Sequence, residues 1–302
     1  MRLEECDRIY SVALSTKDEA EFKALCSELL QWYQINVVTT GRGKSVFWRG
    51  RIVEKEQFTN LRQMLAPDKS QARAGRLNRK GIPCFYLAGD THTALREINA
   101  VTGQLVQFAG FRIRPGVTMS LIVIGEYAHV SKRGHMLLGG EDRNGAVADL
   151  LAKSPNVGLL LSIDKFFAHV LQQEEGEDGS GYMRTQVLAE LLHAEEPEAD
   201  GISFPSVKDT YGFNLGVIGS RSENLFQNVA CQVLSVSGQY MFCMNELANI
   251  RSAIGVAPTG DFVWLPPAED DARYRNIYGF TPEEVEQQRQ KGNLFTGGEA
   301  AS

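Results

Sequence analysis

The sequence predicts an α+β protein in which central mixed or antiparallel sheets are flanked by helices. Two observations lead to this prediction. Segments rich in β-branched and aromatic residues occupy residues 46–53, 105–113 and 117–130, as expected of a central sheet. Segments with apolar residues near helical spacing occupy residues 17–34 and 182–196. At 302 residues, the chain is long enough to bury a core of this kind.

The domain organisation predicted from the sequence is one elaborated α+β domain with two additions. The domain spans residues 45–267 and closes with a helix at residues 244–254. Residues 1–44 form an N-terminal helical extension. Residues 268–302 form a polar tail with a helix candidate at residues 282–291, and such a composition buries little surface.

The composition is that of an ordinary globular protein, with 43% hydrophobic and 23% charged residues. A formal net charge of −6 argues against a general nucleic-acid or membrane-surface binder, because such proteins need a basic surface. Five cysteines without a C-x-x-C pair indicate neither a disulfide framework nor a zinc site. No signal-peptide pattern and no apolar run of the roughly 20 residues that span a bilayer is found. We therefore expect a cytoplasmic protein with no membrane partner and no direct nucleic-acid partner.

Residues 75–97, GRLNRKGIPCFYLAGDTHTALRE, combine a basic turn, a short apolar run and a helix, as one wall of a pocket would. Asn78 and its neighbouring glycines suit the turn. Pro83 keeps the following residues extended, so residues 84–89 are predicted to form a short buried strand that carries Tyr86.

Charged side chains that could complete such a pocket occur in the helix after this apolar run and in an earlier segment of the sequence. Glu97 falls two turns beyond a helix cap at Asp90 or Thr91, where a lone glutamate is usually solvated. In the first β-rich segment, alternation places Arg49 and Arg51 on the same face of a strand. Two adjacent arginines repel each other unless they meet water or an anion.

Three segments together resemble the RES-domain family, which is named for its Arg, Glu and Ser. They are FWRGR at residues 47–51, ARAGRLNRKGIPCFYLAGDTHTALRE at residues 72–97 and DGISFPSV at residues 200–207. The resemblance covers residues 45–236, and the middle motif is specific. Studied members include toxins of bacterial toxin–antitoxin pairs. The resemblance implies a fold similar to that of ADP-ribosyltransferases and consumption of NAD by hydrolysis or phosphorolysis.

The name-giving residues of the family are carried over by position in the motifs. The family arginine falls on Arg49, with Arg51 as a near neighbour that remains open. The family glutamate falls on Glu97, which closes the TALRE helix, and the family serine falls on Ser206, after Pro205. The resemblance therefore implies that Arg49, Glu97 and Ser206 are the catalytic residues.

Further residues of the motifs are expected to bind NAD. The resemblance assigns this task to Arg51, to Arg76 and Asn78 in the turn, to Tyr86 in the strand, and to Asn214 after the serine motif. NAD is expected as a substrate and not as a prosthetic group. No metal site is expected, because four of the five histidines lack metal-ligand spacing (His92, His135, His169 and His193).

These residue types suit cleavage of the nicotinamide–ribose bond. Positive charge grows on the ribose as nicotinamide leaves, and a carboxylate such as that of Glu97 would stabilise this charge. A guanidinium grips two pyrophosphate oxygens in parallel, which suits Arg49 with Arg51 or Arg76. Ser206 is expected to position the substrate, since no Gly-x-Ser-x-Gly elbow surrounds it and a hydroxyl without a base is a weak nucleophile.

The leading hypothesis is an NAD-degrading toxin enzyme, an NAD glycohydrolase or NAD phosphorylase, that arrests growth unless an antitoxin neutralises it. The antitoxin would be a separate helix-turn-helix protein, because no such module is evident in this chain. One alternative is ADP-ribose transfer to a macromolecule. Another is a non-catalytic domain that binds a nucleotide or a partner. The oligomeric state stays open.

Overall fold

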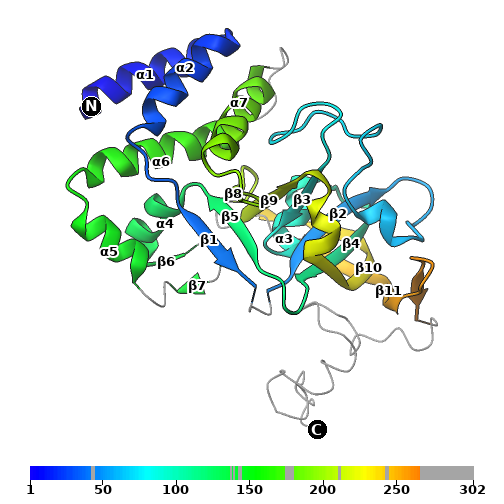
Figure 1. Cartoon of the computed structure of the whole chain (residues 1–302). Helices are drawn as coiled ribbons and strands as arrows, with labels where there is room; N and C mark the ends of the chain where they lie inside the picture. The colour runs from blue at the N-terminus through cyan, green and yellow to red at the C-terminus, as the bar shows by residue number, and fades with distance from the viewer. Residues whose placement is uncertain are drawn as a thin grey trace. The chain divides into compact units, whose positions relative to one another are not determined.

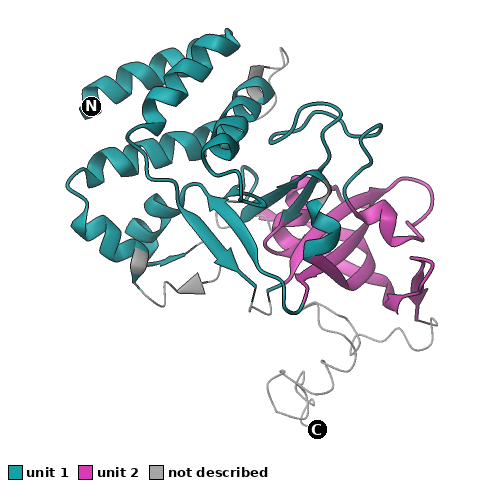
Figure 2. Ribbon diagram, viewed as in Figure 1, with its two compact units in different colours: residues 1–45, 66–87, 115–225 teal, residues 46–65, 88–114, 226–302 magenta. Residues whose placement is uncertain are grey.

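The computed structural model of the chain describes residues 1–41, 45–136, 138, 140–141, 145–173, 180–209, 212–241 and 245–265 (Figure 1). The backbone passes back and forth between two units. Unit 1 comprises residues 1–45, 66–87 and 115–225, and unit 2 comprises residues 46–65, 88–114 and 226–302 (Figure 2). The boundaries predicted after residues 44 and 267 stay a prediction.

Unit 1 combines a mixed sheet with most of the helices. Its strands follow the order β1-β5-β8-β9-β3, with bounds β1 (Val37–Thr40), β3 (Cys84–Ala88, whose last residue belongs to unit 2), β5 (Met119–Val123), β8 (Gly201–Pro205) and β9 (Phe213–Ile218). β5 and β8 run parallel, whereas β1 with β5 and β8 with β9 run antiparallel. The sheet is therefore mixed, as expected.

The helices of unit 1 come from the N-terminal and central parts of the chain. They are α1 (Leu3–Ser15), α2 (Glu19–Leu30), α4 (Glu126–Arg133), α5 (Ala146–Lys153), α6 (Val157–Gln172), α7 (Ser180–Glu195) and α8 (Ser222–Leu225). A 3-10 turn, η2 (Gly219–Arg221), and a small ribbon of β6 (His135–Met136) and β7 (Gly140–Glu141) complete the unit.

Helix α6 is the centre of the core of unit 1, where it contacts α1, α4, α7 and β8. A buried carboxylate, Asp164, ties it to its surroundings. Asp164 accepts hydrogen bonds from the Tyr33 hydroxyl (2.7 Å) and from the backbone N–H groups of Gly125 and Ala128 (2.9 Å each). Burial outweighs these bonds and raises the pKa of Asp164.

Unit 2 is an antiparallel sheet with one helix described beside it. Strands β2 (Phe47–Val53), β4 (Leu105–Ile113), β10 (Phe226–Gln239), β11 (Asn245–Val256) and β12 (Phe262–Trp264) pair in that order, and η1 (Leu61–Met64) and α3 (Thr91–Glu97) complete the unit. The core between α3 and the sheet contains Trp48, Ala94, Leu95 and Phe108.

Most of the predicted elements are confirmed. The segments at residues 46–53, 84–89 and 105–113 are the strands β2, β3 and β4, and the helical segments at residues 17–34 and 182–196 are α2 and α7. Asp90 is the cap of α3, since its carboxylate accepts the N–H of Thr93. Within the described residues, no helix is both long and apolar enough to cross a membrane.

Some predicted elements are wrong, and some observed elements were not predicted. Residues 117–130 form β5 only as far as Val123, because Gly125 adopts a left-handed conformation (φ 84°) from which α4 begins. The predicted closing helix at residues 244–254 is strand β11, which hydrogen-bonds to β10 on one side and β12 on the other. Helix α6 was missed. The tail helix predicted at residues 282–291 lies outside the described residues.

Candidate functional site

The turn before β3 is held together by the side chain of Asn78. Its amide donates hydrogen bonds to the carbonyl groups of Arg73 (2.8 Å), Arg79 (3.1 Å) and Ile82 (2.8 Å), and only 5% of the residue is exposed. Its Oδ1 accepts a hydrogen bond from the hydroxyl of Tyr86 (2.8 Å). Asn78 therefore closes the turn with every polar atom of its side chain.

Tyr86 connects the same turn to strand β3. Its hydroxyl accepts the backbone N–H of Leu77 (2.7 Å) while it donates to Asn78. Burial raises the pKa of Tyr86 well above its usual value, so the hydroxyl keeps its proton at physiological pH. A Cβ at Gly75 would lie 2.8 Å from Asn78 Oδ1 and 2.9 Å from the Tyr86 hydroxyl oxygen, which explains the glycine. The Gly-x-x-Asn turn and the tyrosine are one hydrogen-bonded structure.

Arg76 points from this turn to the C-terminal end of α6. Its Nη1 donates to the carbonyl of Leu171 (2.6 Å) and to the carbonyl of Gln173. The carbonyl groups at the end of a helix carry partial negative charge, so the guanidinium is held where its charge is favourable.

Ser206 lies at the same end of α6, directly after β8. Its backbone carbonyl accepts a hydrogen bond from Nε2 of Gln172 (2.9 Å), and its Oγ accepts the N–H groups of Lys208 and Asp209 (3.1 Å each). The residue is only 2% exposed. Arg76 and Ser206 are distant in the sequence, but they hydrogen-bond to consecutive residues at the end of α6, Leu171 and Gln172.

Asn214 lies on β9 in the neighbourhood of Ser206. It pairs with Phe204 of β8 and is 8% exposed. Five of the predicted residues therefore belong to unit 1, and the structure groups them around the turn before β3 and the loop after β8: Arg76, Asn78, Tyr86, Ser206 and Asn214.

The other predicted residues belong to unit 2. Arg49 is half-buried and Arg51 is exposed, and both point to the same face of β2, as alternation predicts. Gly50 faces the other side, where a Cβ would lie 3.3 Å from the carbonyl oxygen of Ala94 in α3. The helix that carries the half-buried Glu97 thus packs on the face of β2 opposite to the two arginines.

Arg51 has partners of its own within unit 2. Its Nη1 donates to the carbonyl of Gln63 (2.6 Å), and its guanidinium carbon lies 4.5 Å from the ring centroid of Phe58. These contacts fasten the loop around η1 to β2, so the arginine has a structural role whatever else it binds.

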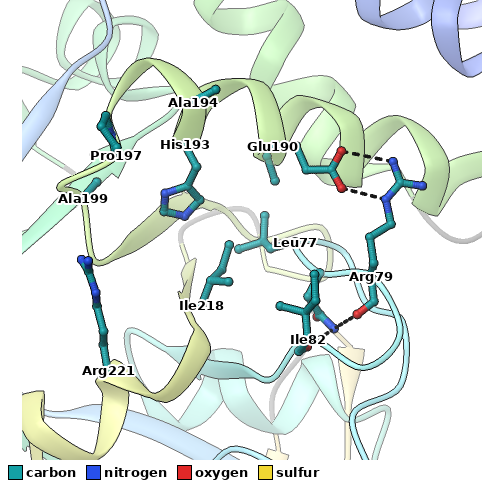
Figure 3. Close-up of a pocket in the computed structure, with 12 residues that line it drawn as sticks. Leu77, Arg79, Ile82, Glu190, His193, Ala194, Pro197, Ala199, Ile218 and Arg221 are labelled. Carbon is teal, nitrogen blue, oxygen red and sulfur yellow. Dashed lines mark hydrogen bonds and ion pairs between the residues drawn. The ribbon is translucent and has the colours of Figure 1, made fainter. Parts of the chain in front are cut away.

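Two polar residues that the sequence did not single out support the turn before β3. Gln186 on α7 donates to the carbonyls of Gly75 (2.9 Å) and Asn78 (3.0 Å). Arg79 forms ion pairs with Glu190 of α7 and Glu19 of α2 (2.7 Å each; Figure 3 shows the first). No local motif marks these residues, because their partners come from remote parts of the chain.

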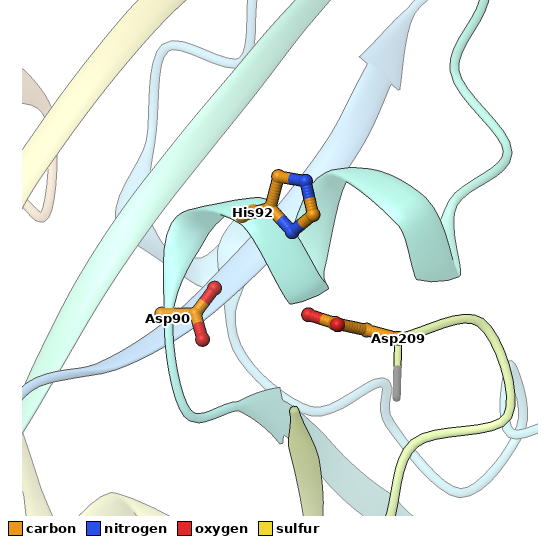
Figure 4. Close-up of side chains that lie close together, drawn as sticks. All are labelled: Asp90, His92 and Asp209. Carbon is orange, nitrogen blue, oxygen red and sulfur yellow. The ribbon is translucent and has the colours of Figure 1, made fainter. Parts of the chain in front are cut away.

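Side chains that could ligate a metal occur in both units. Asp90 and His92 begin α3 in unit 2, and Asp209 follows β8 in unit 1 (Figure 4). The carboxylate of Asp90 is already engaged as a helix cap, since Oδ1 accepts the N–H of Thr93 (2.7 Å) and Oδ2 its hydroxyl (3.0 Å). Asp209 is buried and its N–H is bound to Ser206, so this aspartate shapes the loop after β8.

Comparison with known families identifies the segment that contains these residues. The family model described as RES domain matches residues 47–237, which is more than half of the chain. No curated protein and no solved structure matches the chain.

Proposed function

The chain belongs to the RES domain family, and we propose that it is an NAD-consuming toxin enzyme that cleaves the nicotinamide–ribose bond by hydrolysis or phosphorolysis. The family as a whole is associated with NAD and with toxin–antitoxin systems. The observation that carries the proposal is the matched segment, residues 47–237, because all the predicted site residues fall within it. NAD is the substrate in this proposal, and no prosthetic group takes part.

Glu97 is the proposed stabiliser of the transition state. The ribose gains positive charge as nicotinamide departs, and a carboxylate beside it lowers the energy of that state. The partial burial of Glu97 supports this role, because a charge in a partly dry environment interacts more strongly than one in water. The carboxylate acts by its charge or by holding a ribose hydroxyl or the attacking oxygen, without a covalent intermediate.

Arg76 is the arginine that we propose for the pyrophosphate on the Ser206 side of the substrate. Support comes from their shared position at the end of α6, where Arg76 is already fixed by Leu171. A guanidinium held in this way loses little conformational freedom when it grips a phosphate. Arg49 remains the arginine assigned by the family motif, on β2.

Calorimetric titration with NAD distinguishes the roles of Arg76 and Arg49. Arg76→Lys keeps the charge beside α6 but removes parallel hydrogen bonding, and Arg49→Lys is its matched counterpart. If Arg76 grips the pyrophosphate, only its replacement lowers NAD affinity by about tenfold or more. Loss of affinity in Arg49→Lys alone would return the role to β2.

The reaction type is tested with NAD labelled in its ADP-ribose part. Free ADP-ribose indicates hydrolysis, ADP-ribose 1-phosphate that forms only with added phosphate indicates phosphorolysis, and label on a macromolecule indicates transfer. Unchanged NAD under all conditions would favour a non-catalytic nucleotide-binding or partner-binding domain.

The proposed partner is a separate antitoxin protein of the helix-turn-helix type. In cells, induction of the chain without this partner is expected to stop growth while NAD falls. Normal growth with stable NAD would contradict the toxin role.

A further inference from the structure

Unit 1 contains a cavity beside the C-terminal part of α7. The cavity has a volume of about 390 Å³ and lies among α7, the turn before β3, and the segment from the end of β9 to η2 (Figure 3). Ligand pockets in proteins commonly begin at about this size.

The walls of the cavity are mainly apolar. Large side chains come from the turn and from β9, and small ones come from α7 and the segment after it, so that space is left between them: Leu77, Ile82, Ala189, Ala194, Pro197, Ala199 and Ile218. Ile82 is 42% exposed, and Ala194 and Pro197 are exposed too, so these parts of the cavity wall border solvent. An apolar body of modest size would be desolvated by these walls.

Besides Asn78, Arg79 and Glu190, two nitrogen-bearing side chains make the cavity polar. His193 projects from α7, and its Nε2 is buried with no hydrogen-bond partner in the described part of the chain. Arg221 of η2 is about half exposed, and its Nη1 lies 3.6 Å from Asp200, which is a long and weak ion pair. Burial, followed by the charge of Arg221, lowers the pKa of His193, so the ring is neutral at pH 7 and one of its nitrogens is a donor.

The acidic and basic groups across the cavity do not compete with this end. Arg79 is bound to Glu190 and to Glu19 at 2.7 Å each, so its charge is already matched within this cluster. Figure 3 shows this pair and Arg221 on opposite sides of the cavity. On the other side, within the described residues, the guanidinium of Arg221 has only the long 3.6 Å pair with Asp200, so it is the cation of this cavity that an anion can approach.

The cavity lies away from Ser206 and Asn214, although Asn78 of the turn before β3 is among its lining residues. Ala199 precedes the first residue of β8, whereas Ser206 follows the last, and Ile218 is at the far end of β9 from Asn214. A strand of this length spans about 17 Å. A ligand in the cavity would thus occupy the opposite end of the two strands from the serine.

We propose that this cavity binds a small monocarboxylate with an apolar aromatic or branched aliphatic body. The body lies against Leu77, Ile82 and Ile218, and the carboxylate accepts hydrogen bonds from Arg221 and from His193. Such a ligand satisfies the buried Nε2 in the tautomer in which this nitrogen carries the proton, and it replaces the weak partner of Arg221 with a closer one.

The proposal is tested by calorimetric titration of the full chain with 2-naphthoate and with its neutral analogue 2-naphthamide. The expected result is saturable binding of 2-naphthoate at low-millimolar or lower concentration, about tenfold tighter than that of the amide. Absence of binding in this range, or equal affinity for both compounds, would overturn the proposal.

Variants locate the binding. Ala194→Trp places a large side chain at the exposed wall of the cavity, and Arg221→Gln removes the positive charge of the guanidinium. Both residues are exposed, so one variant can be used if the other does not fold. Each is expected to weaken 2-naphthoate binding by about tenfold or more. Ile250→Trp, at a residue of β11 that is 54% exposed, is the control and leaves binding unchanged. Full affinity in a folded Ala194→Trp or Arg221→Gln protein refutes the site.

Discussion

The hydroxyl of Tyr86 provides a sharp test of how the motif turn is built. It donates to Oδ1 of Asn78 at 2.8 Å and accepts the N–H of Leu77 at 2.7 Å, and both partners are at least 95% buried. Tyr86→Phe keeps the ring but leaves these two buried groups without their partner. Each unsatisfied group costs about 1–3 kcal/mol, so we expect the free energy of unfolding to fall by about 2–4 kcal/mol.

Urea unfolding followed by circular dichroism measures this loss, with Tyr240→Phe as the control. Tyr240 makes one hydrogen bond from its hydroxyl to Glu246 (2.9 Å), but it is 62% exposed, so water replaces the lost partner. The control is expected to stay within about 0.5 kcal/mol of the parent protein. If Tyr86→Phe also stays within that range, the hydroxyl does not hold the turn, and its use by a substrate becomes the better explanation.

Two further predictions concern stability, and both are read from the same unfolding experiment. A Cβ at Gly216 would overlap the side chain of Leu77, so Gly216→Ala is expected to lower the free energy of unfolding by about 1–3 kcal/mol. The control Gly255→Ala has open space around its Cβ and should lower it by less than about 0.5 kcal/mol. Equal losses in the two variants would contradict the packing argument. Asp164→Asn replaces a buried acceptor of three hydrogen bonds and should cost about 1–3 kcal/mol. Because burial raises the pKa of Asp164 above its unfolded value, the native aspartate loses stability as the pH rises through that raised pKa. The free energy of unfolding of the parent protein should therefore exceed that of Asp164→Asn by less at pH 7 than at pH 4. A difference that grows over this range would contradict the raised pKa of Asp164.

The elements that the sequence predicted well are those whose signals are local. The strand that carries Tyr86 lies between Pro83 and a helix cap, and Asp90 does cap α3. The strand predicted at residues 117–130 was too long because the apolar residues continue past Gly125. The left-handed backbone of Gly125 precedes a helix, so the strand ends before it. Conformation at one glycine decided the structure of the residues that follow it.

The mistaken closing helix has a different cause. Residues 244–254 contain good helix formers, but β11 lies between β10 and β12, and its backbone hydrogen-bonds to both. Pairing with distant strands overrides local propensity here, and a single sequence does not show which strands will be neighbours. In the folded chain, half-buried and exposed residues alternate along the first part of β11.

The motifs name the candidate site residues, which stay a prediction, but they do not show which groups these residues bind. The motif residues Asn78 and Tyr86 bind each other, which their spacing alone did not reveal. Arg76 and Ser206 each hydrogen-bond to the end of α6, a helix that was not predicted from the sequence, and Gln186 reaches the turn from α7. Side chains that act through remote backbone groups leave no motif, so only the folded chain identifies them.

The central claim is cleavage of NAD with stabilisation by Glu97, and the rate of nicotinamide release tests it most directly. Purified parent protein, Glu97→Gln and the exposed control Glu54→Gln are incubated with NAD, and initial rates are compared at equal folded concentration. The account predicts release by the parent and by Glu54→Gln, and a loss of about 100-fold in Glu97→Gln, equivalent to about 2.7 kcal/mol of barrier. Release by a folded Glu97→Gln protein at the parent rate, or none by the parent, would contradict it.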